Sequence, residues 1–169
     1  MKSGSTLASQ SKRSSVSGGV RLKYQKENYE TTLKKHWVRP PLHLAKTFQD
    51  KSWAVNLLTS ATAGLLEGDF LEVDCTVGAG AKAALVSPAS CRVHTMQDGN
   101  ATIKQNYLVE KDAILDVWPA PLVLQKDARL RQETTLSIEE SSTALLTEIM
   151  SPGRASFGES FEFTSWSSK

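Results

Sequence analysis

The sequence has few of the features that identify enzymes, metal centres or membrane proteins. Its 169 residues include only two cysteines and three histidines, and the formal net charge is +2. No apolar run approaches the roughly 20 residues that a membrane-spanning helix needs. A chain of this length and charge is expected to form about one soluble domain, with neither a membrane nor a nucleic acid as its partner.

The cysteines and histidines are too scattered to suggest a tight metal site. Cys75 and Cys91 belong to no CxxC pair and have no histidine at ligand spacing. Two cysteines are also too few for a disulfide framework, so we expect buried thiols, with a Cys75–Cys91 bridge as the alternative. His36 and His43 flank a double proline without a third ligand nearby. From the sequence alone, metal ligands remain unknown.

The sequence also lacks a recognisable catalytic motif. No GxSxG elbow is present, which argues against a nucleophilic hydrolase. The loop with Gly64 and Gly68 continues into Asp69 and a strand-like stretch, whereas a Walker loop continues into Lys-Ser/Thr and a helix. We therefore do not expect an enzyme.

Residues 1–19 differ in composition from the rest of the chain. They are rich in serine, glycine and basic residues, and the first acidic residue is Glu27. Such a segment has too little apolar surface to order itself, and it resembles an organelle transit peptide only weakly. The sequence predicts a disordered tail over 1–19 and a folded domain over 20–169.

A loose internal repeat of about 32 residues runs through that domain. Three alanines and three prolines recur at this spacing: Ala81, Ala113 and Ala144, then Pro88, Pro119 and Pro152. Each unit contains a strand-like stretch, a tight corner, a second short strand and a proline break, and the third corner is expected to be one or two residues longer. The repeat predicts a mainly β fold of stacked strand-turn-strand coils, a β-solenoid with few or no helices. Residues 136–150 also suit a helix by composition, but the repeat favours two strands there.

Two further patterns concern turns and charge. Six glycines are expected at structural turns, where they allow unusual backbone angles: Gly64, Gly68, Gly78, Gly80, Gly153 and Gly158. The segment from Glu148 to Glu159 is the densest polar stretch. Its Arg154 is expected either to pair with a carboxylate and lock the turn, or to belong to a partner-facing or water-lined site.

Four motifs in register give the sequence a family resemblance. They are Ala63-Gly64-x-x-x-Gly68-Asp69, Val77-Gly-Ala-Gly-Ala81, Leu115-Asp-Val-Trp-Pro119-x-Pro121 and Gly153-Arg154-x-x-x-Gly158-Glu159. Over roughly residues 40–164 their order and spacing resemble the urease accessory protein family UreD, also called UreH. That resemblance implies a β-solenoid-like fold with very few helices, which agrees with the repeat.

The resemblance also implies a function. Members of the family are cytoplasmic, non-enzymatic chaperones that bind the urease apoprotein, the accessory protein UreF and, through it, the GTPase UreG. The assembly delivers nickel to the urease metallocentre, so nickel is an ion in transit and no cofactor is bound tightly. The alternative function is a β-solenoid module that binds carbohydrate or another ligand, which would predict secretion and ladders of exposed aromatic residues.

Five residues match polar positions of the family and are candidates for lining a nickel path or for structural pairing: Asp69, Asp116, Glu148, Arg154 and Glu159. If Asp69 and Glu159 guide nickel, changing either to alanine should weaken urease activation more than folding. His94 stands where the family tends to have an aromatic residue, and it either binds nickel or fills the same space. Family members continue well past the last motif, so we expect a member that is truncated at its C-terminus, a fragment of one, or one half of a split gene.

Overall fold

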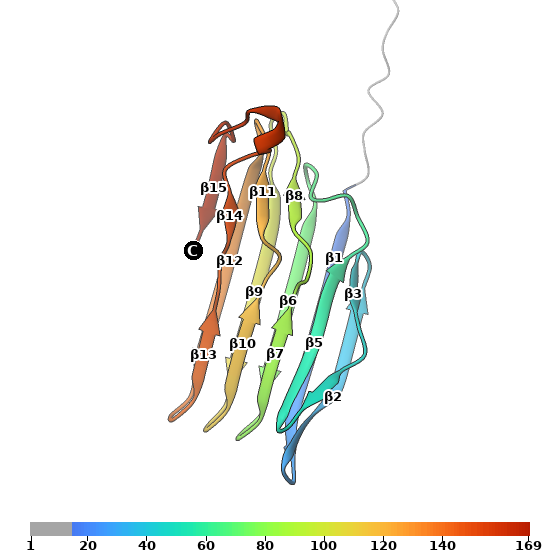
Figure 1. Ribbon diagram of the computed structural model, residues 1–169, viewed down its shortest axis with the longest axis vertical. Coiled ribbons are helices and arrows are strands. Elements are labelled where there is room, and N and C mark those ends of the chain that lie inside the picture. The colour runs from blue at the N-terminus through green and yellow to red at the C-terminus, as the bar shows by residue number, and fades with distance from the viewer. Residues whose placement is uncertain (1–14) are drawn as a thin grey trace, which may run out of the picture.

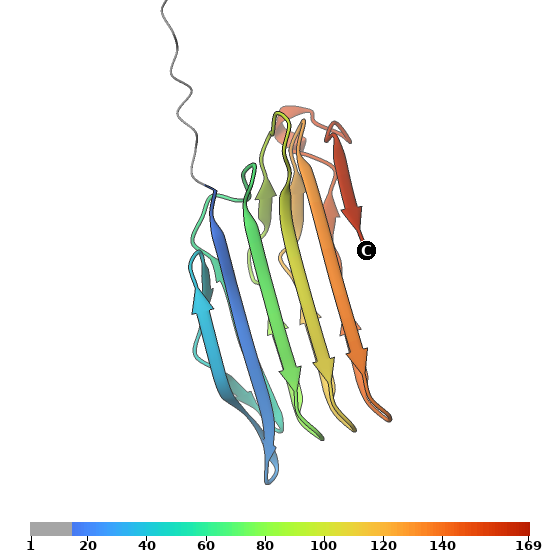
Figure 2. The same cartoon turned by 180° about the vertical axis from the view of Figure 1, so that it is seen from behind.

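The computed structural model describes residues 15–169 and is built almost entirely of β-strands. Two broad sheets lie face to face, and a small third sheet continues the second one (Figures 1 and 2). The strands are β1 (Ser17–Glu27), β2 (Glu30–Arg39), β3 (Leu42–Leu44), β4 (Phe48–Asp50), β5 (Trp53–Ser60), β6 (Phe70–Val77), β7 (Lys82–Val86), β8 (Cys91–Val93), β9 (Ala101–Val109), β10 (Ile114–Trp118), β11 (Leu122–Leu124), β12 (Arg129–Ile138), β13 (Thr143–Leu146), β14 (Met150–Ser151) and β15 (Ser165–Ser168).

Each repeat unit contributes one strand to each sheet. The first sheet has the order β15-β12-β9-β6-β1-β2, the second β13-β10-β7-β5-β3 with β4 on β5, and the third β14-β11-β8. Equivalent strands of successive units pair in parallel, with Phe70 beside Thr102 and Lys82 beside Ile114. Both offsets equal the repeat length, so the predicted β-solenoid of stacked coils is confirmed.

The third unit differs in detail from the sequence alignment. Thr143 pairs with Ile114, so Ser142, and not Ala144, occupies the corner position of Ala113. Because Ile138 also pairs with Val109, the third corner is no longer than the second, and the expected extra length is wrong. In all three corners the corner amide bonds back to a carbonyl three residues earlier, and in the third corner the Ser142 hydroxyl donates to the same Glu139 carbonyl.

The third proline also has a different place from the first two. Pro88 and Pro119 lie in the breaks before β8 and β11, whereas Pro152 follows β14. The break between β13 and β14 instead contains Glu148. A carboxylate therefore stands in the last coil where the coil before it has a proline.

The first strand begins earlier than the tail prediction placed the domain. Ser17, Gly18 and Gly19 belong to β1, which pairs in parallel with β6 and antiparallel with β2. Both glycines allow close packing, since a Cβ on Gly18 would lie 2.5 Å from the Pro41 ring. The sheet therefore includes the last three residues assigned to the tail, and residues 1–14 of that prediction lie outside the described residues.

The hydrophobic core lies between the two layers. Strands of both sheets alternate buried and partly exposed side chains, as half-buried strands do. Leu115 and Leu124 are fully buried, and burying one such side chain stabilises the fold by about 1.5–3 kcal/mol. Next to β1, the Tyr24 hydroxyl donates a 2.8 Å hydrogen bond to the buried Asn56 side chain. A continuous core thus joins the coils.

Other local predictions can be compared directly. Residues 136–150 form the end of β12 followed by β13 and the start of β14, so the two-strand interpretation is confirmed. Within residues 15–169 the only helical segment is one 3-10 turn, η1 (Ala155–Phe157), and no helix there is long and apolar enough to cross a bilayer. Cys75 and Cys91 are both free thiols, so the bridge does not form.

Candidate functional site

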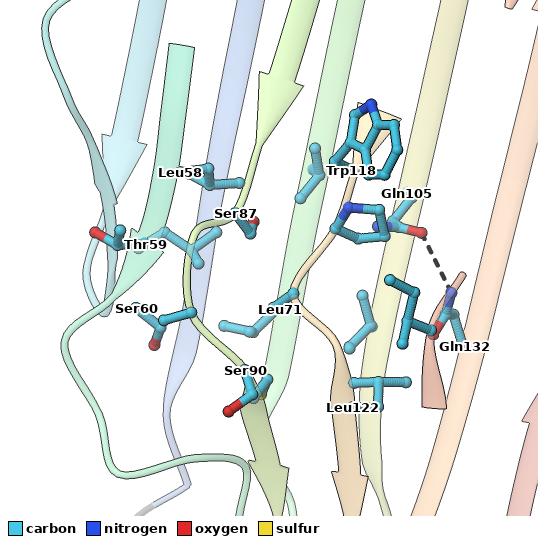
Figure 3. A pocket seen from close by; sticks show the side chains of 18 of the residues that line it. Leu58, Thr59, Ser60, Leu71, Ser87, Ser90, Gln105, Trp118, Leu122 and Gln132 are labelled. Carbon is cyan, nitrogen blue, oxygen red and sulfur yellow. Dashed lines mark hydrogen bonds between the residues drawn. The ribbon is translucent and has the colours of Figure 1, made fainter. Parts of the chain in front are cut away.

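A cavity of about 160 Å³ lies between the two layers. Figure 3 shows it from close by, with side chains from both layers around it. Most of its wall is apolar: Leu42, Leu58, Leu71, Val73, Leu85, Val117 and Leu122. A second hollow of about 350 Å³ adjoins it at the last coil and shares Gln105, Tyr107 and Glu148 with it. Together they form an internal space that continues toward the C-terminal edge of the stack.

A connected set of polar side chains lines the shared part of this space. The Gln105 amide oxygen accepts hydrogen bonds from the Thr134 hydroxyl at 3.0 Å and from the Gln132 amide at 3.5 Å, the latter drawn as a dashed line in Figure 3. Gln132 also donates to Oε1 of Glu148, which accepts a 3.1 Å bond from the Ser168 hydroxyl as well. The set therefore reaches from the buried centre of the first sheet to an exposed carboxylate.

Strand alternation explains how these side chains reach the interior. Gln105 lies on β9 between the inward-facing Ile103 and Tyr107, and Gln132 follows the inward-facing Leu130 on β12. Both glutamines are buried, with exposed fractions of 9% and 5%. Across the sheet, the interior row that contains Gln105 begins with Val38 on β2, passes through Val20 and Val73, and ends with Thr134 on β12. The interior thus changes from apolar to polar toward the last coil.

The chemistry of this site follows from its oxygen atoms. It offers one carboxylate, a side-chain amide oxygen and hydroxyls, which are ligands that suit a hard or borderline divalent cation. Within residues 15–169 no group of three or more His, Cys, Asp or Glu side chains is placed to hold a metal ion. A single carboxylate with neutral oxygens binds a cation weakly, which suits passage better than storage.

Asp69 lies elsewhere and is used by the backbone. It is buried, and its two carboxylate oxygens accept hydrogen bonds from the amides of Val16 at 2.8 Å and Leu66 at 2.9 Å. It lines neither hollow. This geometry favours the structural alternative for Asp69, because it fixes the glycine loop and the entry of β1 at the same time.

Asp116 lies on the opposite side of its sheet from the cavity. Its neighbours Leu115 and Val117 are buried in the core, so alternation along β10 directs Asp116 to the outer face. The structure therefore separates Asp116 from Glu148, although the sequence grouped them as candidates for one path.

Arg154 and Glu159 form a local pair at the last turn. The Arg154 guanidinium donates to both oxygens of the Glu159 carboxylate, and its backbone amide donates a 3.1 Å bond to the same group. These bonds, chiefly those from the guanidinium, lower the pKa of Glu159 to about 2. The guanidinium also lies 4.3 Å from the centre of the Phe157 ring. The contacts favour the alternative in which Arg154 locks the turn.

His94 packs against the glycine loop. Its Nε2 lies 3.2 Å from the Ala63 carbonyl oxygen and donates a hydrogen bond to it, and its backbone amide bonds to Leu65. Neither hollow is lined by His94. These contacts suit a side chain that fills space next to the loop.

The glycines follow the prediction with one exception. Five have positive φ angles, namely Gly64, Gly68, Gly80, Gly153 and Gly158, and Gly78 does not. Gly64 also approaches Arg92 so closely that a Cβ would lie 2.3 Å from its carbonyl oxygen. Gly78 is needed for space, since a Cβ would lie 2.9 Å from the Tyr24 carbonyl oxygen.

Several residues of the site were not anticipated from the sequence. Glu148 was a candidate, but Gln105, Gln132, Thr134 and Ser168 were not. A signal for the glutamines was present, because each follows an apolar inward position of its strand by two residues. The pairing with Glu148 depends on the register of three separate strands, which the sequence does not fix.

Comparison with known proteins identifies the family. The family model described as UreD urease accessory protein matches residues 16–169. The chain belongs to the UreD family. It is 36% identical over 125 residues to the urease accessory protein UreD of Opitutus terrae, covering 73% of this chain and 46% of that relative. It is 29% identical over 142 residues to UreH of Helicobacter hepaticus, covering 84% of this chain and 56% of that relative.

A third relative agrees with these two. UreD of Yersinia pseudotuberculosis is 30% identical over 142 residues, covering 82% of this chain and 44% of the relative. The chain thus spans about half the length of the curated relatives that it matches. The family resemblance noted from the four sequence motifs is confirmed.

Proposed function

We propose that this chain is a non-enzymatic chaperone of urease maturation that assists nickel insertion into the urease metallocentre. It acts in the cytoplasm and binds the urease structural subunits on the one hand, and the accessory protein UreF and, through it, UreG on the other. Nickel is the cargo of the assembly and is held only in transit. The names of the relatives, which are urease accessory proteins, support this proposal.

The observation that carries the proposal is the polar lining of the internal space. Thr134, Gln105, Gln132 and Glu148 are joined by hydrogen bonds along a space whose wall is mostly apolar. Buried polar side chains cost free energy unless they are satisfied, so a core that needed only stability would favour apolar residues there. A hydrated cation passing between the layers would meet neutral oxygens first and the carboxylate at the edge.

The same geometry gives no support to the ligand-binding alternative. A carbohydrate-binding solenoid needs exposed aromatic side chains that stack from coil to coil. The exposed Trp118 has Val86 as its neighbour on the adjacent coil. The exposed Trp37 contacts Arg21, at 4.9 Å from the ring centre. These two exposed tryptophans therefore do not begin an aromatic ladder.

The proposal is tested by co-purification with defined partners. Tagged chain is mixed separately with purified urease structural subunits and with purified UreF, and then with UreF and UreG together. We expect capture of the urease subunits and of UreF, and capture of UreG only when UreF is present. If a folded chain captured neither the urease subunits nor UreF, the proposed function would be wrong.

A further inference from the structure

The outer face of the second sheet is unusually apolar. Side chains that alternate with the core residues of β5, β7, β10 and β13 point away from the interior, and β4 extends the same face. We call the following residues the outer patch: Phe48, Trp53, Val55, Leu57, Ala84, Val86, Ile114, Asp116 and Leu145. Leu145 and Phe48 are 54% and 56% exposed. The other seven residues of the outer patch are partly exposed, so apolar surface reaches solvent across this face.

Strand pairing arranges the middle of the outer patch as one straight row. Asp116 lies beside Leu145 on one side and Ala84 on the other. Ala84 lies beside Val55, which lies beside Phe48. One carboxylate therefore interrupts an apolar row that crosses five strands.

The outer face of the first sheet has the opposite character. There, Arg21 contacts both Glu72 and Asp74, and the Asn106 amide donates a 2.7 Å hydrogen bond to Asp74. These side chains form a cross-strand polar network on a solvated face, as expected for a surface without a partner. The contrast between the two faces singles out the outer patch.

Asp116 lacks the partners that comparable carboxylates have. Its Oδ1 atom is buried, yet within residues 15–169 it has no hydrogen-bond partner. The nearest basic position in the pairing is Lys82, which lies beside Ile114 in the next row and forms no salt bridge with Asp116 in the described part of the chain. A buried carboxylate oxygen without a donor is costly, and a donor from another molecule would remove that cost.

The size of the outer patch limits what can cover it. Five strands at about 4.8 Å spacing span roughly 19 Å, and three rows of side chains extend roughly 14 Å along the strands. The resulting area, roughly 270 Å², is of the size of the apolar patches of a few hundred Å² that are often functional on monomers. It is smaller than the roughly 800 Å² per partner of a standard interface between two copies. A single helix, about 10 Å wide and about 13 residues long, would cover it.

We propose that the outer patch is the docking surface for an amphipathic helix of a partner protein, which places a lysine or arginine against Asp116. The apolar side chains of the helix cover the row from Leu145 to Phe48, and its basic group supplies the missing donor. The identity of the partner rests on the proposed function, since the proteins to be tested are the urease subunits and the accessory proteins named there. The outer patch would thus be the binding face, and it would recognise an apolar helix surface that carries one basic group.

The test measures binding of four variants to each purified partner. Asp116→Lys reverses the charge, Asp116→Asn removes it with little change in shape, and Leu145→Glu places a charge on the apolar row. Asn106→Lys on the opposite outer face is the matched control. For one partner we expect about a tenfold or larger loss of affinity with Asp116→Lys and Leu145→Glu, a smaller loss with Asp116→Asn and none with Asn106→Lys. Circular dichroism confirms that each variant is folded.

A second measurement identifies the docked segment. Hydrogen exchange of the affected partner, with and without this chain, is expected to protect a helix that contains a lysine or arginine. Changing that residue to glutamate should restore binding to Asp116→Lys. The proposal is overturned if the partners bind all four variants like the unchanged chain, or if the protected segment has no basic residue. It is also overturned if the patch variants abolish only self-association of this chain.

The outcomes separate this inference from the proposed function. If no partner binds the unchanged chain, the proposed function fails. If partners bind the unchanged chain and every patch variant equally, only the docking surface is wrong and the proposed function stands.

Discussion

Gln132 and Glu148 connect the two layers of the solenoid through one hydrogen bond. The Gln132 amide on β12 of the first sheet donates to the carboxylate of Glu148, which lies in the break between β13 and β14. Gln132 also bonds to Gln105 within its own sheet. A carboxylate at the edge is thereby linked to amide groups in the interior, and this link defines the candidate path for a cation.

Glu148→Gln is expected to lower urease activation several-fold with little change in stability. The substitution keeps an oxygen that accepts hydrogen bonds from Gln132 and Ser168 but removes the only charge of the set. The measurement is urease activity after maturation in the presence of each variant, beside a thermal melt. Glu140→Gln, at an exposed corner, is the matched control. Activation equal to that of the unchanged chain would remove Glu148 from the path.

Asp69→Ala is expected to reduce stability more than it reduces function per folded molecule. The change leaves the amides of Val16 and Leu66 without their acceptors, and each buried unsatisfied group costs about 1–3 kcal/mol. Denaturant unfolding measures the loss. Asp69→Asn keeps an oxygen that can accept from one of the two amides, so it should lose less stability than Asp69→Ala. If Asp69→Ala were as stable as the unchanged chain but inactive, the path interpretation of the sequence would be favoured instead.

The Arg154–Glu159 pair is expected to contribute stability that decreases at acidic pH. In the folded protein the pKa of the Glu159 carboxyl, about 2, lies below the usual glutamate value near 4.3. Because folding lowers this pKa, the ionised carboxylate stabilises the folded turn at pH values above the unfolded pKa. This contribution is lost as the pH falls from about 4 toward 2. Glu159→Gln should flatten that part of the pH profile. NMR titration of the Glu159 carboxyl provides the check, and a midpoint near 4.3 would show that the pair does not form in solution.

Tyr24→Phe is expected to destabilise the fold by about 1–2 kcal/mol, because it removes a buried hydrogen bond and leaves the Asn56 oxygen with only its longer 3.3 Å contact to Thr47. Tyr107→Phe is the control, since Tyr107 is equally buried but lines the internal space. Urea unfolding of both variants gives the comparison. If both variants lost the same free energy of unfolding, the hydrogen bond from the Tyr24 hydroxyl to Asn56 would make no additional contribution to stability.

The sequence predicted the architecture better than it predicted the site. Parallel coils followed from the recurrence of strands and corners, because each unit must bury its apolar face on the next. The alignment of Ala144 with Ala113 was wrong by two residues, since small residues also occur inside strands and only the pairing of Thr143 with Ile114 fixes the register. The same uncertainty hid which side chains face the interior.

For the acidic candidates, spacing in the sequence alone could not distinguish residues that line a nickel path from residues with a structural role. Glu148 lines the internal space, Asp69 and Glu159 are engaged by neighbouring donors, and Asp116 lies on the outer face. Their chemistry is the same, and their surroundings differ because of long-range pairing. One residue of shift in register moves a side chain to the opposite face of a sheet, so no local pattern decides this.

The most direct test of the account measures nickel transfer through the assembled complex. Nickel-loaded UreG is added to urease apoprotein together with UreF and this chain, and the nickel bound to urease is quantified over time. With Gln132→Leu, which breaks the link between Gln105 and Glu148, we predict a complex of unchanged composition that transfers nickel several-fold more slowly. Transfer at the unchanged rate by an intact complex would contradict the claim that the ion passes between the layers.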